Sequence, residues 1–296
     1  PGIVPGVNLS ILALTRPGDK VMIQPPVYFP FFDGIKKNNR TLVENRLILE
    51  NGRYQIDFED FENQLKNGVK LFILSNPHNP GGNVWTKEEL MKMGELCLKY
   101  NTLIISDEIH ADIVYPPNVY RPLASLSKEI AEQTITFISP SKTFNIAGLA
   151  SAVSVISNKV IREGFNNMLD RLHIANGNLF GTVAFEVAYR HGDEWLDQLI
   201  DYLADNLKFI TEKIDNEIEG IKVIQPEGTY LAWLDCRELP IDNSKIHQFM
   251  IDEAKIGMND GASFGDNGKG FQRLNFGCSR SVLEKALNQI EAAVEK

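Results

Sequence analysis

The stretch SPSKTFN, residues 139–145, decides how the rest of the sequence is interpreted. It directly follows TITFI at 134–138, an apolar and β-branched run that is typical of a buried strand. Lys142 therefore lies just past the end of a predicted strand. In open α/β sheets ligands bind outside the carboxyl ends of the strands, so we expect Lys142 to lie at a functional site.

Two further strand-like runs also end in polar residues. The run 70–74 leads to Asn79, and the run 102–105 leads to Asp107. The three runs begin 32 residues apart each time, which is the length of a βαβ unit. Because the carboxyl ends of parallel strands meet at one edge of a sheet, we expect Asn79, Asp107 and Lys142 to converge there.

An amine, a carboxylate and an amide at one sheet edge match the needs of pyridoxal phosphate. This cofactor requires a lysine that forms a Schiff base with its aldehyde, an acid beside its ring nitrogen and a donor to its phenolic oxygen. Lys142, Asp107 and Asn79 supply these groups in that order. An ionised Asp107 would keep the ring nitrogen protonated, which makes the ring an electron sink.

The motifs that carry these residues resemble those of the fold-type I, class I and II aminotransferases, which depend on pyridoxal 5′-phosphate. The matching motifs are NPG at 79–81, SDEIH at 106–110 and SxSKTFN at 139–145. The motifs that resemble the cystathionine β-lyase, or C–S lyase, branch more closely are PPVY at 25–28, NPHNP at 76–80, SKTFNIAGL at 141–149 and RLN at 273–275. The resemblance covers the whole chain.

The resemblance implies roles for further residues. Tyr28 would stack on the cofactor ring and assist the departing sulfur, whereas most tyrosines are simply packed aromatics. His110 stands where typical aminotransferases carry a tyrosine, and the resemblance places it near the cofactor. Ser139 and Ser141 would hold the cofactor phosphate, although capping of the following turn also explains them. Arg273 would bind the substrate α-carboxylate through two parallel hydrogen bonds.

The first residues of the chain predict an anion site. A turn at Gly2 leads into an apolar helix, so the backbone N–H groups at Ile3 and Val4 are free to bind a cofactor phosphate, unless this is a plain loop-to-helix turn. Ala150 stands where typical class I enzymes carry a phosphate-binding arginine, eight residues after the lysine. In the resembled family this turn is internal, so we expect the chain to be truncated at its amino terminus.

The predicted fold class is α/β, a PLP-dependent transferase fold. We expect a mainly parallel sheet in a large cofactor-binding domain, residues 1–204, and a smaller α+β carboxyl-terminal domain, residues 205–296. An amphipathic helix over 193–218 connects them. Residues 47–61 indicate a short hairpin and an acidic helix start, to which we assign no chemistry. TKEE at 86–89 predicts a capping box at the start of a crossover helix.

Composition narrows the function classes. A net charge of −9 argues against a nucleic-acid or anionic-membrane surface. The three cysteines, Cys97, Cys236 and Cys278, are too few and scattered for a disulfide framework or a metal site. No apolar run is long enough to span a bilayer, and no signal peptide is recognisable, so we expect a cytoplasmic protein with no membrane partner.

Three functions remain open from the sequence. The first is β-elimination from a sulfur amino acid by a PLP-dependent C–S lyase, and the second is transamination by a class I/II aminotransferase. Both use Lys142 as the mobile base, so residue identity does not separate them. The third is a non-catalytic regulatory or interaction protein that retains the fold, which the intact lysine and acid motifs disfavour. The resemblance also implies a homodimer, with an amino acid as its small-molecule substrate.

The position of Lys142 generates a direct prediction. The full-length protein with pyridoxal phosphate should be yellow, and borohydride reduction should fix the cofactor on Lys142, because this amine follows the third strand of the predicted sheet. Mass mapping of the reduced protein identifies the labelled peptide. A cofactor adduct on another lysine would refute the assignment.

Overall fold

A six-stranded sheet forms the centre of the computed structural model, which describes residues 2–296. Five strands run parallel, and the last one, at the edge, pairs antiparallel with its neighbour. In spatial order the strands are β2 (Thr41–Glu44), β1 (Lys20–Ile23), β5 (Val69–Ser75), β6 (Leu103–Asp107), β7 (Thr134–Ile138) and β8 (Val153–Ile156). The parallel pairing brings the carboxyl ends of β5, β6 and β7 to one edge.

Helices cover both faces of this sheet, so its strands are apolar on both sides. Along β5, Leu71 and Ile73 belong to one buried cluster, whereas Phe72 and Leu74 belong to another. The helices that pack on the first face are α1 (Ile3–Leu14), α2 (Pro30–Lys37) and α6 (Lys159–Arg171). Those on the second face are α3 (Phe58–Lys66), α4 (Lys87–Lys99) and α5 (Lys128–Glu132). A short helical turn, η1 (Leu123–Ser125), adds to the second face.

A second, antiparallel sheet carries the carboxyl-terminal part of the chain. In spatial order its strands are β11 (Asn259–Asp260), β12 (Phe271–Asn275), β10 (Leu231–Asp235) and β9 (Lys222–Ile224). A third buried cluster lies between this sheet and the helices α8 (Asp193–Glu217), α9 (Ile246–Asp252) and α10 (Arg280–Val294). The remaining elements are the hairpin β3 (Ile48–Glu50) and β4 (Arg53–Gln55), helix α7 (Leu179–His191), and the turns η2 (Ala147–Leu149), η3 (Gly261–Phe264) and η4 (Asp266–Gly268).

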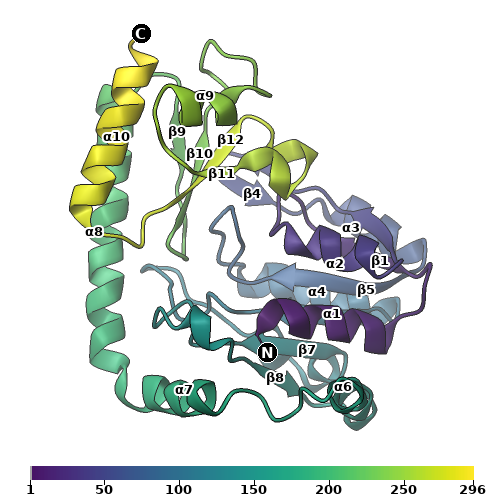
Figure 1. The fold of residues 1–296 in the computed structure, drawn as a ribbon. Helices are drawn as coiled ribbons and strands as arrows, with labels where there is room; N and C mark the ends of the chain where they lie inside the picture. Colours follow the sequence, from purple (N-terminus) through teal and green to yellow (C-terminus); the bar gives the residue numbers. More distant parts are fainter. Residues whose placement is uncertain (1) are drawn as a thin grey trace.

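Helix α8 spans the height of the molecule, from α7 beside the large sheet to the small sheet, and α10 lies along its upper half (Figure 1). Along α8 the buried side chains keep helical spacing, at Leu203, Asn206, Ile210 and Ile214. None of the helices in residues 2–296 combines the length and the apolar character that crossing a membrane requires.

The α/β fold class with a mainly parallel sheet is confirmed. The expected connecting helix is present over Asp193–Glu217, and residues 47–61 form the hairpin β3–β4 and the start of α3. Thr86 and Glu89 make the reciprocal hydrogen bonds of a capping box before α4. The division into domains at 204/205 falls inside α8 and stays a prediction.

Asn206 generates a stability prediction, because it is the buried polar group that ties α8 to the segment after β12. Its amide donates to the carbonyls of Phe276, at 3.1 Å, and Cys278, at 3.0 Å, and its oxygen accepts from Arg280 at 2.9 Å. Replacing Asn206 with Leu leaves these groups unpaired, so the free energy of unfolding should fall by about 2 to 4 kcal/mol. Urea unfolding monitored by circular dichroism measures this loss.

The matched control is Asn288→Leu on the exposed face of α10. This substitution should change the free energy of unfolding by no more than about 0.5 kcal/mol. Equal effects of the two substitutions would mean that the buried amide of Asn206 contributes nothing.

Candidate active site

A cavity of about 360 Å³ lies where the carboxyl ends of β5 and β6 face the start of α1 and the four-stranded sheet. Nine of the ten residues that the sequence nominated line it. They are Ile3, Val4, Tyr28, Asn79, Asp107, His110, Ser141, Lys142 and Arg273. The tenth, Ser139, does not. The structure therefore brings together residues that lie far apart in the sequence.

Asp107 is the last residue of β6, and its carboxyl group is buried. The backbone N–H of Ile109 donates to Oδ1 at 3.2 Å. Burial raises the pKa of Asp107 to about 7 in spite of this bond and of the positive charge of Lys142. A carboxylate in such a place gains most from a cationic N–H partner, because an opposite charge offsets the cost of burial.

Lys142 lies in the turn after β7, half-buried, and its side chain reaches the cavity. Within residues 2–296, its amino group has no hydrogen bond or ion pair. The turn itself is well held. Thr143 donates through its hydroxyl to Asp112 at 2.7 Å, and Phe144 donates its backbone N–H to the carbonyl of Pro140 at 2.8 Å. The amine is therefore positioned by its neighbours but left free to react.

Arg273 comes from β12 in the small sheet and is held between two amides. It donates to the side-chain oxygens of Asn79 and Asn259, both at 2.8 Å. Its Nε is buried and lacks a partner in the part of the chain that the structure describes. Because a buried guanidinium N–H is costly to leave unpaired, this edge of Arg273 is suited to a carboxylate.

The amino end of α1 forms another wall of the cavity. Gly2 caps the helix with φ 98°, a left-handed conformation that glycine adopts without strain, and Ile3 and Val4 line the cavity. Ser141 lies there too, whereas Ser139 lies behind it. The Ser139 hydroxyl donates to the carbonyl of Ser151 at 2.6 Å and accepts from the N–H of Ser141 at 3.1 Å. Ser139 thus supports this wall, and its predicted bond to phosphate stays a prediction.

His110 and Tyr28 lie near the charged groups of the cavity. Burial lowers the pKa of His110 to about 3, and the positive charges of Lys142 and Arg273 add to this, so the imidazole is neutral. Burial raises the pKa of Tyr28, as does the nearby Asp107. Both side chains are therefore neutral at pH 7.

Tyr230 and Asn259 are among the residues that line the cavity but were not predicted to do so from the sequence. Tyr230 precedes β10, and its ring meets the edge of His110 at a centroid distance of 5.6 Å. Asn259 belongs to the two-residue strand β11. A lone tyrosine or asparagine before a weak strand carries no distinctive pattern, so nothing in the sequence indicated that these side chains reach the cavity.

The donor set of the cavity fits pyridoxal phosphate. Among residues 2–296, Lys142 offers an amine with no hydrogen bond or ion pair, Asp107 offers a buried acid, and the first turn of α1 offers backbone N–H groups that a helix leaves without a partner of its own. The free edge of Arg273 fits the carboxylate of an amino acid. A doubly wound sheet with such a cavity is characteristic of proteins that act on amino acids through pyridoxal phosphate.

Comparison with known proteins identifies the family. The sequence model of the family "aminotransferase class I and II" matches residues 2–290. The chain therefore belongs to the class I and II aminotransferase family, and it is an enzyme of that family.

Individual relatives narrow the branch. The chain is 40% identical over 295 residues to cystathionine beta-lyase PatB of Bacillus subtilis (strain 168). The aligned region covers 99% of this chain and 76% of the relative. A PLP-bound putative aminotransferase from Clostridium difficile 630 matches with a TM-score of 0.97 and 45% identity, covering 99% of this chain and 76% of that one. Cystalysin from Treponema denticola, which contains a pyridoxal 5′-phosphate cofactor, matches with a TM-score of 0.97 and 37% identity over 99% and 75%. The expected family, its C–S lyase branch and its cofactor are confirmed.

The raised pKa of Asp107 generates a prediction on pH. The unfolded chain loses this proton near pH 4, whereas the folded chain keeps it up to about pH 7. The folded state therefore binds more protons between these values, and Asp107 makes the free energy of unfolding fall as the pH rises through this window. Asp107→Asn removes that titration. We compare the cofactor-free variant and parent by the difference in their free energies of unfolding, variant minus parent. This difference should rise by about 2 to 3 kcal/mol from pH 5 to pH 8.

Urea unfolding of both proteins at the two pH values measures this difference. All other titrating groups, including the neutral His110, are common to both proteins and cancel in the comparison. A relative stability that stays constant from pH 5 to pH 8 would show that Asp107 ionises normally in the folded chain.

Proposed function

We propose that this enzyme is a PLP-dependent C–S lyase that acts by β-elimination on a sulfur amino acid such as cystathionine, releasing pyruvate, ammonia and a thiol. The observation that carries the proposal is the single cavity that joins Lys142, Asp107 and Arg273. These residues supply a base, an acid partner for the cofactor ring and a carboxylate-binding fork. The relation to PatB, named a cystathionine beta-lyase, supports the reaction type.

The residues that would hold the cofactor come from the large sheet and α1. Lys142 would attach it, Asp107 would pair with its ring nitrogen, and Asn79 would donate its amide N–H to the phenolic oxygen. The oxygen of Asn79 already accepts from Arg273, which leaves its NH₂ group for this task. The N–H groups of Ile3 and Val4 and the hydroxyls of Ser139 and Ser141 are the proposed phosphate donors, and Tyr28 and His110 flank the ring.

When bound, pyridoxal phosphate supplies an electron sink conjugated to the amino nitrogen of the substrate. Arg273 binds the α-carboxylate and so orients the Cα–H bond toward Lys142. Lys142 would take the Cα proton as a general base. The Cβ–S bond then breaks with its electron pair on sulfur. Tyr28, which lines the same cavity, is the group proposed to assist the departing thiolate.

Transamination is the runner-up, favoured by the family itself and by the relative described as a putative aminotransferase. It uses the same residues up to removal of the Cα proton and differs in where that proton returns. A regulatory protein that has lost catalysis is the third alternative. The presence of Lys142 and Asp107 in the cavity counts against it.

We also propose that the protein is a cytoplasmic homodimer with a domain boundary near 204/205. Helix α7 and its surroundings expose large apolar side chains that a second copy would cover. They include Leu179, Phe180, Val183, Val187 and Trp195. A continuous apolar face of this kind is typical of an interface between subunits.

The proposed reaction predicts independence from keto acids. With cystathionine and no acceptor, the full-length holoenzyme should release pyruvate and thiol in equal amounts over many turnovers. An aminotransferase would stop after about one turnover, because the amino group stays with the enzyme until a keto acid removes it. Coupled pyruvate detection and thiol titration, with and without added 2-oxoglutarate, distinguish the two. A burst that resumes only with the keto acid would overturn the lyase assignment.

A further inference from the structure

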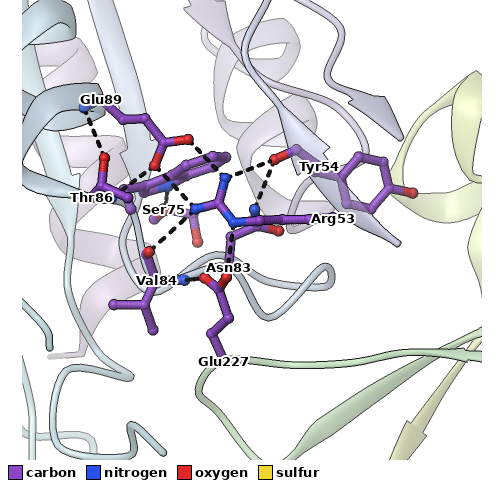
Figure 2. A network of polar contacts seen from close by, with 9 residues as sticks. Arg53, Tyr54, Ser75, Asn83, Val84, Thr86, Glu89 and Glu227 are labelled. Atoms are coloured by element: carbon purple, nitrogen blue, oxygen red, sulfur yellow. Dashed lines mark hydrogen bonds and ion pairs between the residues drawn. The ribbon is translucent and has the colours of Figure 1, made fainter. Parts of the chain in front are cut away.

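The two sheets are joined at a small ionic cluster outside the cavity. Arg53 of the hairpin β3–β4 lies between Glu89 of α4 and Glu227 of the segment before β10 (Figure 2). Its Nε is 2.8 Å from Glu227 Oε1, and its NH1 is 2.7 Å from Glu89 Oε1. The side chains of Arg53 and Glu227 are only 24% and 23% exposed, so solvent screens this pair less than it screens a surface ion pair. We call these three residues the Arg53 cluster.

Contacts on the side of the large sheet hold Arg53 in place independently of Glu227. Glu89 binds it with both oxygens, since NH2 lies 3.0 Å from Oε2. Glu89 is itself immobilised, because its Oε2 accepts the backbone N–H of Thr86 at 2.7 Å in the capping box of α4. The guanidinium also lies over the ring of Trp85, 5.6 Å from its centroid. Only the Nε edge of Arg53 faces Glu227.

Glu227 binds the loop after β5 through one carboxylate oxygen and its own backbone, while its other oxygen binds Arg53. Its Oε2 accepts the N–H of Val84 at 2.7 Å. Its backbone N–H donates to the carbonyl of Gly82 at 2.9 Å, and the N–H of Gly228 donates to the same carbonyl at 3.1 Å. The approach is close, because a Cβ on Gly82 would lie 2.4 Å from the Cβ of Pro226. This loop also carries the cavity residue Asn79.

Thr229, two residues after Glu227, is hydrogen-bonded to the loop after β6. Its N–H donates to the carbonyl of Ile113 at 2.8 Å, and its carbonyl accepts the hydroxyl of Tyr115 at 2.6 Å. The N–H of Tyr115 donates in turn to the carbonyl of Glu227 at 2.9 Å. Residues 227–229 are therefore attached to two of the loops that carry predicted cofactor ligands, the loop after β5 with Asn79 and the loop after β6 with His110.

The chain enters the cavity directly after this anchored segment. Tyr230 lines the cavity, and β10 then pairs with β12 so that Trp233 lies opposite Arg273. The position of Arg273 relative to Asn79 depends on how the first residues of β10 are held. The hydrogen bond from Arg273 to Asn79, at 2.8 Å, connects the small sheet to the loop after β5 and tolerates little displacement.

We propose that Glu227, oriented by Arg53, is a positioning residue that sets the affinity of the enzyme for the amino-acid carboxylate, by holding Tyr230 and Arg273 against the loop of Asn79. The inference rests on the proposed role of Arg273 in carboxylate binding. Glu227 is not among the residues that line the cavity within the described part of the chain. It acts through the backbone that leads into β10.

The test is Glu227→Gln in the full-length holoenzyme. A glutamine has one acceptor oxygen, so it can bond either Arg53 or Val84, and its NH₂ group faces the other donor. Loss of a hydrogen bond to a charged group should raise the dissociation constant for the amino acid about ten- to hundredfold. It should change kcat by less than about threefold, because Lys142 and Asp107 are untouched. Amide hydrogen exchange in residues 227–231 should accelerate, and this is also measurable in the cofactor-free chain.

The matched control is Glu291→Gln, which breaks a partly buried ion pair with Lys213 that lies wholly between α8 and α10. It should leave amino-acid affinity and exchange in residues 227–231 unchanged. Arg53→Met should reproduce the Glu227→Gln effect, and the double variant should be no worse than either single one, because both break the same contact.

Amino-acid affinity is measured by titrating the change in visible absorption of the bound cofactor, which needs binding but no release of thiol. Failure of the lyase reaction would therefore leave this test intact. An unaltered dissociation constant in folded Glu227→Gln protein, or an equal loss of affinity in the Glu291→Gln control, would overturn the inference.

Discussion

The structure depends on the parallel pairing of β5, β6 and β7, which places the ends of three strands at one edge. Main-chain hydrogen bonds of the sheet satisfy the strands up to Ser75, Asp107 and Ile138. Beyond these points the backbone turns away, and side chains rather than carbonyls face the space at the edge. The small sheet then closes this space with β12 and the residue before β10. The cavity lies where the two sheets meet, and one buried cluster contains side chains of both, including Phe72 of β5 and Trp233 of β10.

The electrostatics of the cavity follow from burial with incomplete pairing. Asp107 keeps a raised pKa because it has lost water and gained only one backbone donor. Within residues 2–296 the buried Nε of Arg273 has no partner. Burial lowers the pKa of His110, to which the positive charges of Lys142 and Arg273 add, and so keeps the imidazole neutral. Each of these groups costs stability in the chain alone. A cationic ring nitrogen beside Asp107 and a carboxylate beside Arg273 would offset those costs, which links cofactor and substrate binding to the stability of the folded state.

The Arg53 cluster gives the hairpin β3–β4 a purpose that its composition did not suggest. The hairpin lies in a region to which we assigned no chemistry, and its arginine looks like any exposed charge in the sequence. In the folded chain Arg53 is bound on one side by the capping box of α4 and on the other by Glu227. A charged contact between two sheets is directional, because hydrogen-bond geometry fixes the position of both partners. An apolar contact of equal area would permit sliding.

The sequence by itself determined the α/β fold, the hairpin at 47–61, the connecting helix and the grouping of Asn79, Asp107 and Lys142. These features depend on local periodicity and on the βαβ rhythm, both of which are properties of neighbouring residues. Resemblance to a family added Arg273, Tyr28 and His110. Only the tertiary structure showed that Tyr230 and Asn259 line the cavity, that Ser139 does not, and that Arg53 binds Glu227. Those contacts connect residues separated by long stretches of chain, and their partners are chosen by how the two sheets pack, which no local pattern encodes.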